Sequence, residues 1–137
     1  MGYEQILARV PLFARCTPDE LASLTALALV NEFSAEQIIV TQNTPGTAFY
    51  VILEGHVEVV RDGESISTLG PGEFFGEMSL MDSAPRSATI RAAEPTRCMM
   101  LSSWDFRAAL ERHPTIAVKL LEVLTQRLRA ADALTDG

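Results

Sequence analysis

The sequence predicts an α+β domain in which an antiparallel β-roll (a double-stranded β-helix or jelly roll) is flanked by N-terminal helices and two C-terminal helices. Apolar residues recur at helical spacing before residue 33 and after residue 103. Between them, short runs rich in valine, isoleucine, threonine and aromatic residues alternate with turn signals. Because 137 residues suffice to bury a core, we expect a single domain over residues 1–137.

The N-terminal helices are expected within residues 1–32. A short helix is predicted over residues 3–9, and residues 11–13 are expected to fold back as an apolar connector. The sequence Thr17-Pro18-Asp19-Glu20 combines a capping hydroxyl, a first-turn proline and a third-position carboxylate. Because leucines follow at helical spacing, a second helix is predicted from about residue 18 to residue 30.

Residues 33–101 are expected to form the β-roll. Residues 49–53 predict a buried strand, and residues 56–60 alternate as in a strand with two different faces. Asp62-Gly63 favours a tight hairpin that leads into a strand over residues 65–69. Further turn signals at residues 43–46 and 70–72 give the strand spacing that is typical of a barrel or a double-sheet roll.

The C-terminal helices are expected over residues 103–134. Ser103 is predicted to begin a helix that ends near His113, and Pro114 suits the first turn of the last helix. Such a helix packs its apolar stripe either on its own domain or on a partner, such as an effector domain or a second copy in a homodimer. The apolar stripe contains Ala117, Leu120, Leu121, Leu124, Leu128 and Ala131.

Composition excludes several classes of protein. A hydrophobic content of 47% argues against disorder, and no apolar run approaches the roughly 18 residues of a membrane span. A net charge of -7 argues against direct nucleic-acid binding. Cys16 and Cys98 lie far apart without metal-ligand spacing, so both are expected to be reduced. Without a targeting signal near the N-terminus, the expected location is the cytoplasm.

The candidate site lies in residues 70–90, GPGEFFGEMSLMDSAPRSATI. Three glycines lead into residues 77–81, which suffice for little more than one helical turn, and the start of such a turn presents backbone N–H groups to an anion. Arg86 is expected to add a planar guanidinium, which suits a phosphate. Residues 1–82 contain three arginines against twelve carboxylates, so anion capture must be local.

This segment and the elements around it resemble the cyclic nucleotide-binding domain of catabolite activator proteins, protein kinase A regulatory subunits and cyclic-nucleotide-gated channels. The resemblance covers nearly the whole chain, and residues 74–90 match the family's phosphate-binding cassette. It implies that Arg86 pairs with the cyclic phosphate and that Glu77 accepts a hydrogen bond from the ribose 2′-hydroxyl. The implied phosphate cradle contains Gly76, Glu77, Met78, Ser79, Ser87 and Ala88, and the implied contacts to the base are Val59, Ile66 and Leu69.

The resemblance leaves the base open between adenine and guanine. Catabolite activator proteins place a hydroxyl residue of the last helix against adenine, and the matching place here holds Ala131. Ser87 serves the phosphate in a cAMP site and also reaches the guanine amino group in a cGMP site, so cAMP is favoured only narrowly. Arg127 and Arg129 either cap the base from the last helix, which then acts as a lid, or remain in solvent.

The expected function is that of a regulatory sensor that binds cAMP or cGMP, uses no cofactor or metal, and is not an enzyme. The alternative is a degenerate domain in which Glu77 and Arg86 pair with each other and the fold serves protein–protein assembly. A cupin-like metal enzyme is disfavoured, because His56 and His113 are too far apart to cluster. A hydrolase is disfavoured because no serine or cysteine has a recognisable basic partner. The regulated output stays open.

Overall fold

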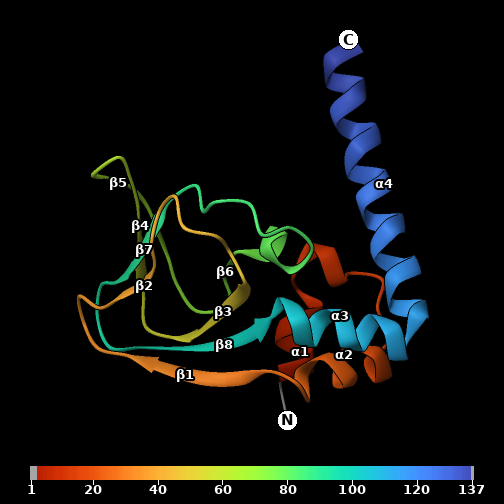
Figure 1. Ribbon diagram of the computed structural model, residues 1–137, viewed down its shortest axis with the longest axis horizontal. Coiled ribbons are helices and arrows are strands. Elements are labelled where there is room, and N and C mark those ends of the chain that lie inside the picture. Colours follow the sequence, from red (N-terminus) through yellow and green to blue (C-terminus); the bar gives the residue numbers. More distant parts are fainter. Residues whose placement is uncertain (1–2, 137) are drawn as a thin grey trace. The chain divides into compact units, whose positions relative to one another are not determined.

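The computed structural model describes the backbone of residues 3–136 and the side chains of residues 3–133 (Figure 1). The chain forms two compact units. One contains the segments up to residue 26 and from residue 108 onward, and the other contains residues 27–107. Within residues 3–136, no helix combines the length and the apolar character that crossing a membrane requires. The expected domain bounds at residues 1 and 137 lie outside the described residues.

Residues 27–107 contain the expected antiparallel β-roll, which is built from two four-stranded sheets. The strand order is β1-β8-β3-β6 in the first sheet and β2-β7-β4-β5 in the second, so that β8 runs between β1 and β3 (Figure 1). A short 3-10 helix, η2, follows β6. The bounds are β1 Leu29–Phe33, β2 Ile38–Val40, β3 Ala48–Glu54, β4 Val57–Arg61, β5 Glu64–Leu69, β6 Phe74–Phe75, η2 Glu77–Leu80, β7 Thr89–Ala92 and β8 Thr96–Ser102.

The core of the roll receives apolar side chains from both sheets. The first five residues of β3 are buried, as predicted for this strand. Tyr50 of β3 stacks on Phe75 of β6, with ring centroids 4.9 Å apart and an interplanar angle of 15°. Val57 and Ile90 of the second sheet belong to the same buried cluster. Each such side chain stabilises the fold by about 1.5–3 kcal/mol through burial, so this cluster holds the two sheets together.

The β4–β5 hairpin turns at the predicted dipeptide. Asp62 and Gly63 have φ values of 54° and 82°, the left-handed pair that a two-residue hairpin of this type requires. The pairing of β4 with β5 shifts after the turn, because Val59 is opposite Ser67 whereas Val60 is opposite Ser65. Ile66 therefore has no cross-strand partner in the ladder and is 48% exposed.

The helical elements are α1 (Tyr3–Ala8), η1 (Pro11–Phe13), α2 (Pro18–Thr25), α3 (Ser103–Arg112) and α4 (Pro114–Asp136). The capping box at Thr17 and Glu20 is present as predicted, with hydrogen bonds of 2.8 and 3.2 Å. The predicted end of α2 at residue 30 is wrong, because Leu29 and Val30 belong to β1 and pair with β8. The hydroxyl that accepts from the first turn of α3 belongs to Ser102, whose Oγ lies 3.3 Å from the backbone nitrogen of Asp105.

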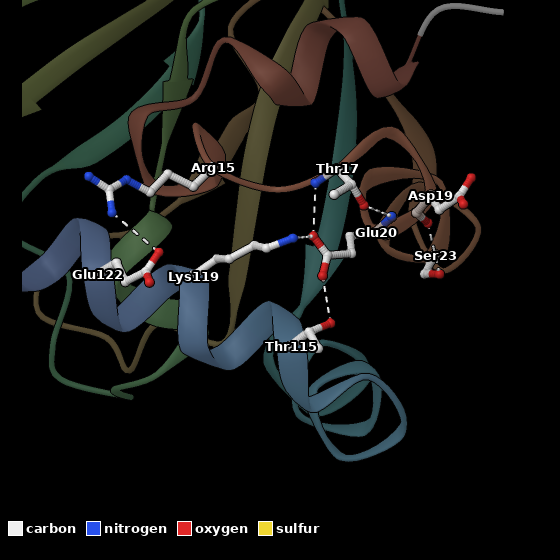
Figure 2. Close-up of polar contacts among 8 residues, drawn as sticks. All are labelled: Arg15, Thr17, Asp19, Glu20, Ser23, Thr115, Lys119 and Glu122. Carbon is white, nitrogen blue, oxygen red and sulfur yellow. Dashed lines mark hydrogen bonds and ion pairs between the residues drawn. The ribbon is translucent and has the colours of Figure 1, made fainter.

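A polar cluster joins α2 to the first turns of α4 (Figure 2). Oε1 of Glu20 accepts hydrogen bonds from the Thr17 backbone nitrogen at 2.8 Å and from Lys119 Nζ at 2.5 Å. Oε2 of Glu20 accepts from Thr115 Oγ1 at 2.6 Å. These bonds, above all the one from Lys119, lower the pKa of Glu20 to about 2. The carboxylate of Glu20 thus anchors one face of α4 to α2.

The apolar stripe predicted on α4 does not lie on one buried face. The buried residues of this helix are Ile116, Leu120 and Val123, which are spaced four and three residues apart. Successive helical residues are separated by about 100°, so Leu120 and its neighbour Leu121 face different directions. Leu121, Leu124 and Leu128 are 62%, 36% and 64% exposed. Of the four predicted leucines, only Leu120 is buried, and the other three form a separate stripe.

Candidate functional site

A cavity of about 300 Å³ opens in the β-roll beside η2 and the segment that follows it. One part of its wall is apolar and comes from strands of both sheets, and the other is polar and comes mostly from residues 76–87. The apolar part contains Val40, Val59, Leu69, Phe75, Ala88 and Ile90. The remaining lining residues are Arg61, Gly76, Glu77, Met78, Ser79, Asp82, Ala84, Pro85, Arg86 and Ser87.

The backbone around Arg86 is fixed by antiparallel pairing with the loop before β3. The backbone nitrogen of Arg86 donates to the carbonyl oxygen of Thr44 at 2.8 Å, and that of Asn43 donates to the carbonyl oxygen of Arg86 at 2.8 Å. Gly46 continues the pairing with a 3.2 Å hydrogen bond to Ala84. The cassette segment is therefore held on the roll by main-chain bonds that do not depend on a ligand.

Two glycines make room for the side chain of Arg86. Gly76 has a φ of 82°, and a Cβ at this position would overlap Nη1 of Arg86 and lie 2.8 Å from the carbonyl oxygen of Ala48. A Cβ at Gly46 would overlap Oγ of Ser79 and lie 3.0 Å from Nε of Arg86. Gly46 was not among the predicted site residues, because a glycine after Pro45 is equally typical of an ordinary turn.

Arg86 is a half-buried cation on the wall of this cavity. Its Nη2 donates a 2.7 Å hydrogen bond to the carbonyl oxygen of Ala48. Burial lowers the pKa of Arg86 from its usual value, and the nearby Tyr50 acts in the opposite direction. An arginine remains protonated in proteins. The guanidinium is therefore a partly desolvated positive charge, and such a charge attracts an anion more strongly than one in bulk solvent.

The turn before Arg86 has the short helical form that its length predicts. Gly76 caps η2 in the left-handed conformation, and Glu77 is the first residue of the turn. Ser79 is buried and its backbone nitrogen donates to the carbonyl oxygen of Gly76 at 2.9 Å. One N–H of the predicted cradle is thus already paired within the turn. Met78 also borders the cavity but is 68% exposed.

The structure brings most of the predicted site residues to this one cavity. They are Val59, Leu69, Gly76, Glu77, Met78, Ser79, Arg86, Ser87 and Ala88. Ile66 is the exception: it is 48% exposed on β5 and lies outside the set that lines the cavity. Arg127 and Arg129 are exposed on α4, in the other unit, so their contact with a base stays a prediction.

Arg61 lines the cavity and was not predicted. It follows Val57 and Val59 at two-residue spacing, and residues two apart on a strand share a face. The alternation of residues 57, 59 and 61 is the sequence signal that could have identified Arg61 as a residue of the cavity. Arg61 lies between the predicted strand over residues 56–60 and the predicted turn at Asp62-Gly63, so neither prediction included it.

Comparison with known proteins gives consistent matches. The family model described as "Cyclic nucleotide-binding domain" matches residues 30–113. A putative potassium channel protein of Rhodopseudomonas palustris is 34% identical over 125 residues, 89% of this chain and 30% of that protein. The cyclic AMP receptor protein of Thermus thermophilus is 34% identical over 131 residues, 92% of this chain and 61% of that protein. The chain therefore spans less than two thirds of either relative.

Among solved structures, the N-terminal domain of a transcriptional regulator from Streptomyces coelicolor is similar over nearly its whole length. The TM-score is 0.88 at 31% sequence identity, and the alignment covers 95% of this chain and 94% of that one. This likeness shows that the same combination of a β-roll and helices occurs in another protein.

Proposed function

Because the chain belongs to the cyclic nucleotide-binding domain family, we propose that it is a regulatory module that binds cAMP or cGMP in the cavity of the β-roll. The observation that carries this proposal is Arg86, a half-buried guanidinium enclosed by Gly46 and Gly76 beside a cavity with an apolar wall. A cyclic nucleotide has the matching parts, because its phosphate is an anion and its base is a flat, weakly polar ring.

The remaining residues of the cavity have complementary roles in this proposal. Glu77 accepts a hydrogen bond from the ribose 2′-hydroxyl, while Arg86 separates its carboxylate from the phosphate and so limits their repulsion. Backbone groups near Gly76 and Ser87 complete the cradle. Val59 and Leu69 contact the base, and burying the base against them adds affinity through the hydrophobic effect.

The proposed output is a change in the position of α4. In this proposal α4 acts as a lid that closes over the bound base, with Arg127 and Arg129 as its candidate contacts. The chain is a sensor and not an enzyme, and it acts in the cytoplasm without direct contact to nucleic acid. Its net charge of -7 supports the last point. The regulated activity belongs to an effector domain or a partner.

A thermal-unfolding experiment tests nucleotide binding directly. The protein is heated alone, with cAMP, with cGMP and with linear 5′-AMP as the matched control. A ligand at 100 times its dissociation constant adds about 2.7 kcal/mol to the free energy of unfolding, so a cyclic nucleotide raises the Tm by several degrees. An unchanged Tm with both cyclic nucleotides at millimolar concentration contradicts the proposal.

A second candidate function, self-assembly through α4, is favoured by the exposed leucine stripe. Leu121, Leu124 and Leu128 are spaced three and four residues apart, which is the pattern of a coiled-coil seam. Pairing two copies of this chain would remove three large apolar side chains of each copy from water. This function is compatible with nucleotide binding, or replaces it if the pocket proves to be degenerate.

Light scattering on the purified protein tests self-assembly. The wild type is expected to have the mass of a dimer, and the double variant Leu121→Gln/Leu128→Gln that of a monomer. Ile38→Gln is the control, because Ile38 is 52% exposed but belongs to β2 and not to α4. A monomeric wild type at high micromolar concentration contradicts the second candidate without affecting the first.

A further inference from the structure

Arg61 ends the strand that forms one wall of the cavity. Val57, Val59 and Arg61 share one face of β4; Val57 is buried, Val59 is half-buried and Arg61 is exposed. β4 pairs with β7 without a register shift, and Val59 lies opposite Ile90, which also lines the cavity. The apolar wall formed by Val59 and Ile90 therefore leads outward to the guanidinium of Arg61 at the rim.

The side chain of Arg61 is tied to the phosphate cassette. Its Nε donates a 3.1 Å hydrogen bond to the carbonyl oxygen of Ser87, the residue that follows Arg86. This bond orients the guanidinium and leaves its two terminal nitrogens as donors. The neighbouring carboxylate, that of Asp62, accepts a 2.9 Å hydrogen bond from Nε2 of Gln42.

Arg61 also differs from the arginines on the outer surface of the roll. Arg91 pairs with Glu58, and Arg97 pairs with Glu54 at 2.8 Å. Within the part of the chain whose side chains are described, no carboxylate lies within ion-pair distance of Arg61. The cavity thus has a second guanidinium, at its rim, that is oriented but not neutralised by an ion pair.

The chemistry of a cyclic mononucleotide assigns different tasks to the two guanidinium groups. Such a ligand has a single phosphate, and Arg86 with the turn at Gly76 accounts for it. A base lying on Val59 and Ile90 presents an edge toward the rim, where Arg61 lies. Guanine has two acceptors on its Hoogsteen edge, N7 and O6, whereas adenine has the acceptor N7 beside the N6 amino donor. A fork of two donors matches guanine and is half mismatched with adenine.

We infer that Arg61 is a specificity-determining residue that binds N7 and O6 of guanine and favours cGMP over cAMP. The inference rests on the proposed function, since it requires a cyclic nucleotide in the cavity. It replaces the narrow preference for cAMP expected from the sequence with a preference for cGMP. Ser87 reaches the 2-amino group of guanine, whereas Arg61 reads the opposite edge of the same base.

Calorimetry with three nucleotides separates these two contacts. cGMP has N7, O6 and the 2-amino group; cyclic IMP keeps N7 and O6 but lacks the amino group; and cAMP lacks O6. We expect wild-type protein to bind cGMP and cyclic IMP with similar affinity, about tenfold more tightly than cAMP, as is usual for one bidentate arginine–guanine contact. Arg61→Ala should weaken cGMP and cyclic IMP about tenfold and change cAMP affinity less than threefold.

Two further variants control for charge and for folding. Arg61→Lys keeps the positive charge without the planar fork, so it is expected to lose the preference as Arg61→Ala does. Arg91→Ala removes an arginine that is paired with Glu58 on a neighbouring strand, and it is expected to leave all three affinities unchanged. A Tm within a few degrees of wild type shows that each variant is folded.

Three results overturn the inference while leaving the proposed function intact. Cyclic IMP that binds as weakly as cAMP shows that the 2-amino group is read instead. Equal weakening of all three nucleotides in Arg61→Ala shows that Arg61 supports the phosphate or the fold. Unchanged affinities in that variant show that Arg61 does not contact the ligand. If wild-type protein binds none of the three, the proposed function itself fails.

Discussion

The guanidinium of Arg86 donates a 2.7 Å hydrogen bond from Nη2 to the carbonyl oxygen of Ala48. This bond connects the segment after η2 to the first residue of β3, which belongs to the buried core of the roll. Its acceptor is a neutral carbonyl, so the bond positions the guanidinium without cancelling its charge. A phosphate arriving in the cavity therefore meets an oriented cation, which reduces the ordering cost of binding.

Replacing Arg86 is expected to remove most of the nucleotide affinity. Arg86→Ala leaves a buried phosphate without the guanidinium fork, and we expect binding of cAMP and cGMP to weaken more than 100-fold. Arg86→Lys retains a charge but not the bidentate geometry, so its affinity is expected to lie between those of Arg86→Ala and wild-type protein. Calorimetry measures the affinities. A folded Arg86→Ala protein with wild-type affinity contradicts the assignment of Arg86 to the phosphate.

Gly76→Ala is expected to disturb Arg86 without altering it chemically. The added methyl group overlaps Nη1 of Arg86 and approaches the carbonyl oxygen of Ala48, and the φ of 82° is strained for alanine. Gly72→Ala is the matched control, because Gly72 has a φ of 85° and its Cβ would meet nothing within 4 Å. Both variants should lose about 1–2 kcal/mol of stability through strain. Only Gly76→Ala should also lose nucleotide affinity, as measured by calorimetry.

Glu77 is expected to discriminate between ribose and deoxyribose. A hydrogen bond to a charged group contributes about 1.5–3 kcal/mol, so Glu77→Ala should weaken cAMP binding roughly 10- to 100-fold. Removing the 2′-hydroxyl from the ligand should have a similar effect on wild-type protein and little effect on the variant. Measuring all four affinities gives a double-mutant cycle for the pair. Equal losses for 2′-deoxy-cAMP in both proteins would show that Glu77 does not contact the sugar.

The pKa of Glu20 predicts a pH dependence of stability at acid pH. Its folded-state pKa of about 2 is below the ordinary value of 4.5, because Lys119, Thr115 and Thr17 bind its ionised form. The stabilisation is therefore complete above pH 4.5 and is lost as the pH falls toward 2. Urea unfolding of Glu20→Gln should show a loss of about 2 kcal/mol at pH 7. Its free energy of unfolding should also fall less steeply than that of wild type between pH 4.5 and 2.

Glu122→Gln provides the control for this measurement. Glu122 pairs with Arg15 at 3.2 Å, but both side chains are more than 40% exposed, and exposed pairs contribute about 0–1 kcal/mol. We expect this variant to retain the wild-type pH profile. If Glu20→Gln and Glu122→Gln behave alike, the anchoring role of Glu20 is wrong.

The sequence predicted those parts of the fold that local patterns determine. The capping box at Thr17, the turn at Asp62-Gly63 and the buried strand β3 are local signals, and all three are present. The end of α2 was predicted too late, because Leu29 suits a helix as well as a strand and only its pairing with Met100 in β8 decides between them. That pairing joins residues far apart in the sequence.

In the candidate site too, contacts within one segment were predictable from the sequence, and contacts between distant segments were not. Residues 74–90 are contiguous, so their arrangement around the turn at Gly76 followed from the order of residues. Contacts contributed by distant segments did not: Gly46 is next to Arg86 because of the pairing between the loop before β3 and residues 84–86. Ile66 was assigned to the cavity by the family resemblance, but it lies three residues from Leu69 on β5, and side chains an odd number of residues apart on a strand point to opposite faces.

The last prediction concerns α4, whose two halves differ in their contacts. The first half contains the buried Ile116, Leu120 and Val123 and is anchored by Lys119 to Glu20, whereas residues 124–133 are all exposed. Backbone hydrogen bonds in a helical segment without buried side chains open readily. In the free protein, we therefore expect amide hydrogen exchange to be faster in residues 124–133 than in residues 116–123.

If α4 closes over a bound base, saturating cyclic nucleotide should protect residues 124–133 specifically, because the bound base supplies contacts that the free protein lacks. The same measurement on Arg86→Ala is the control, and there the nucleotide should have no effect. Equal exchange of residues 124–133 in free and saturated wild-type protein would contradict a ligand-driven lid, even where calorimetry shows that the nucleotide is bound.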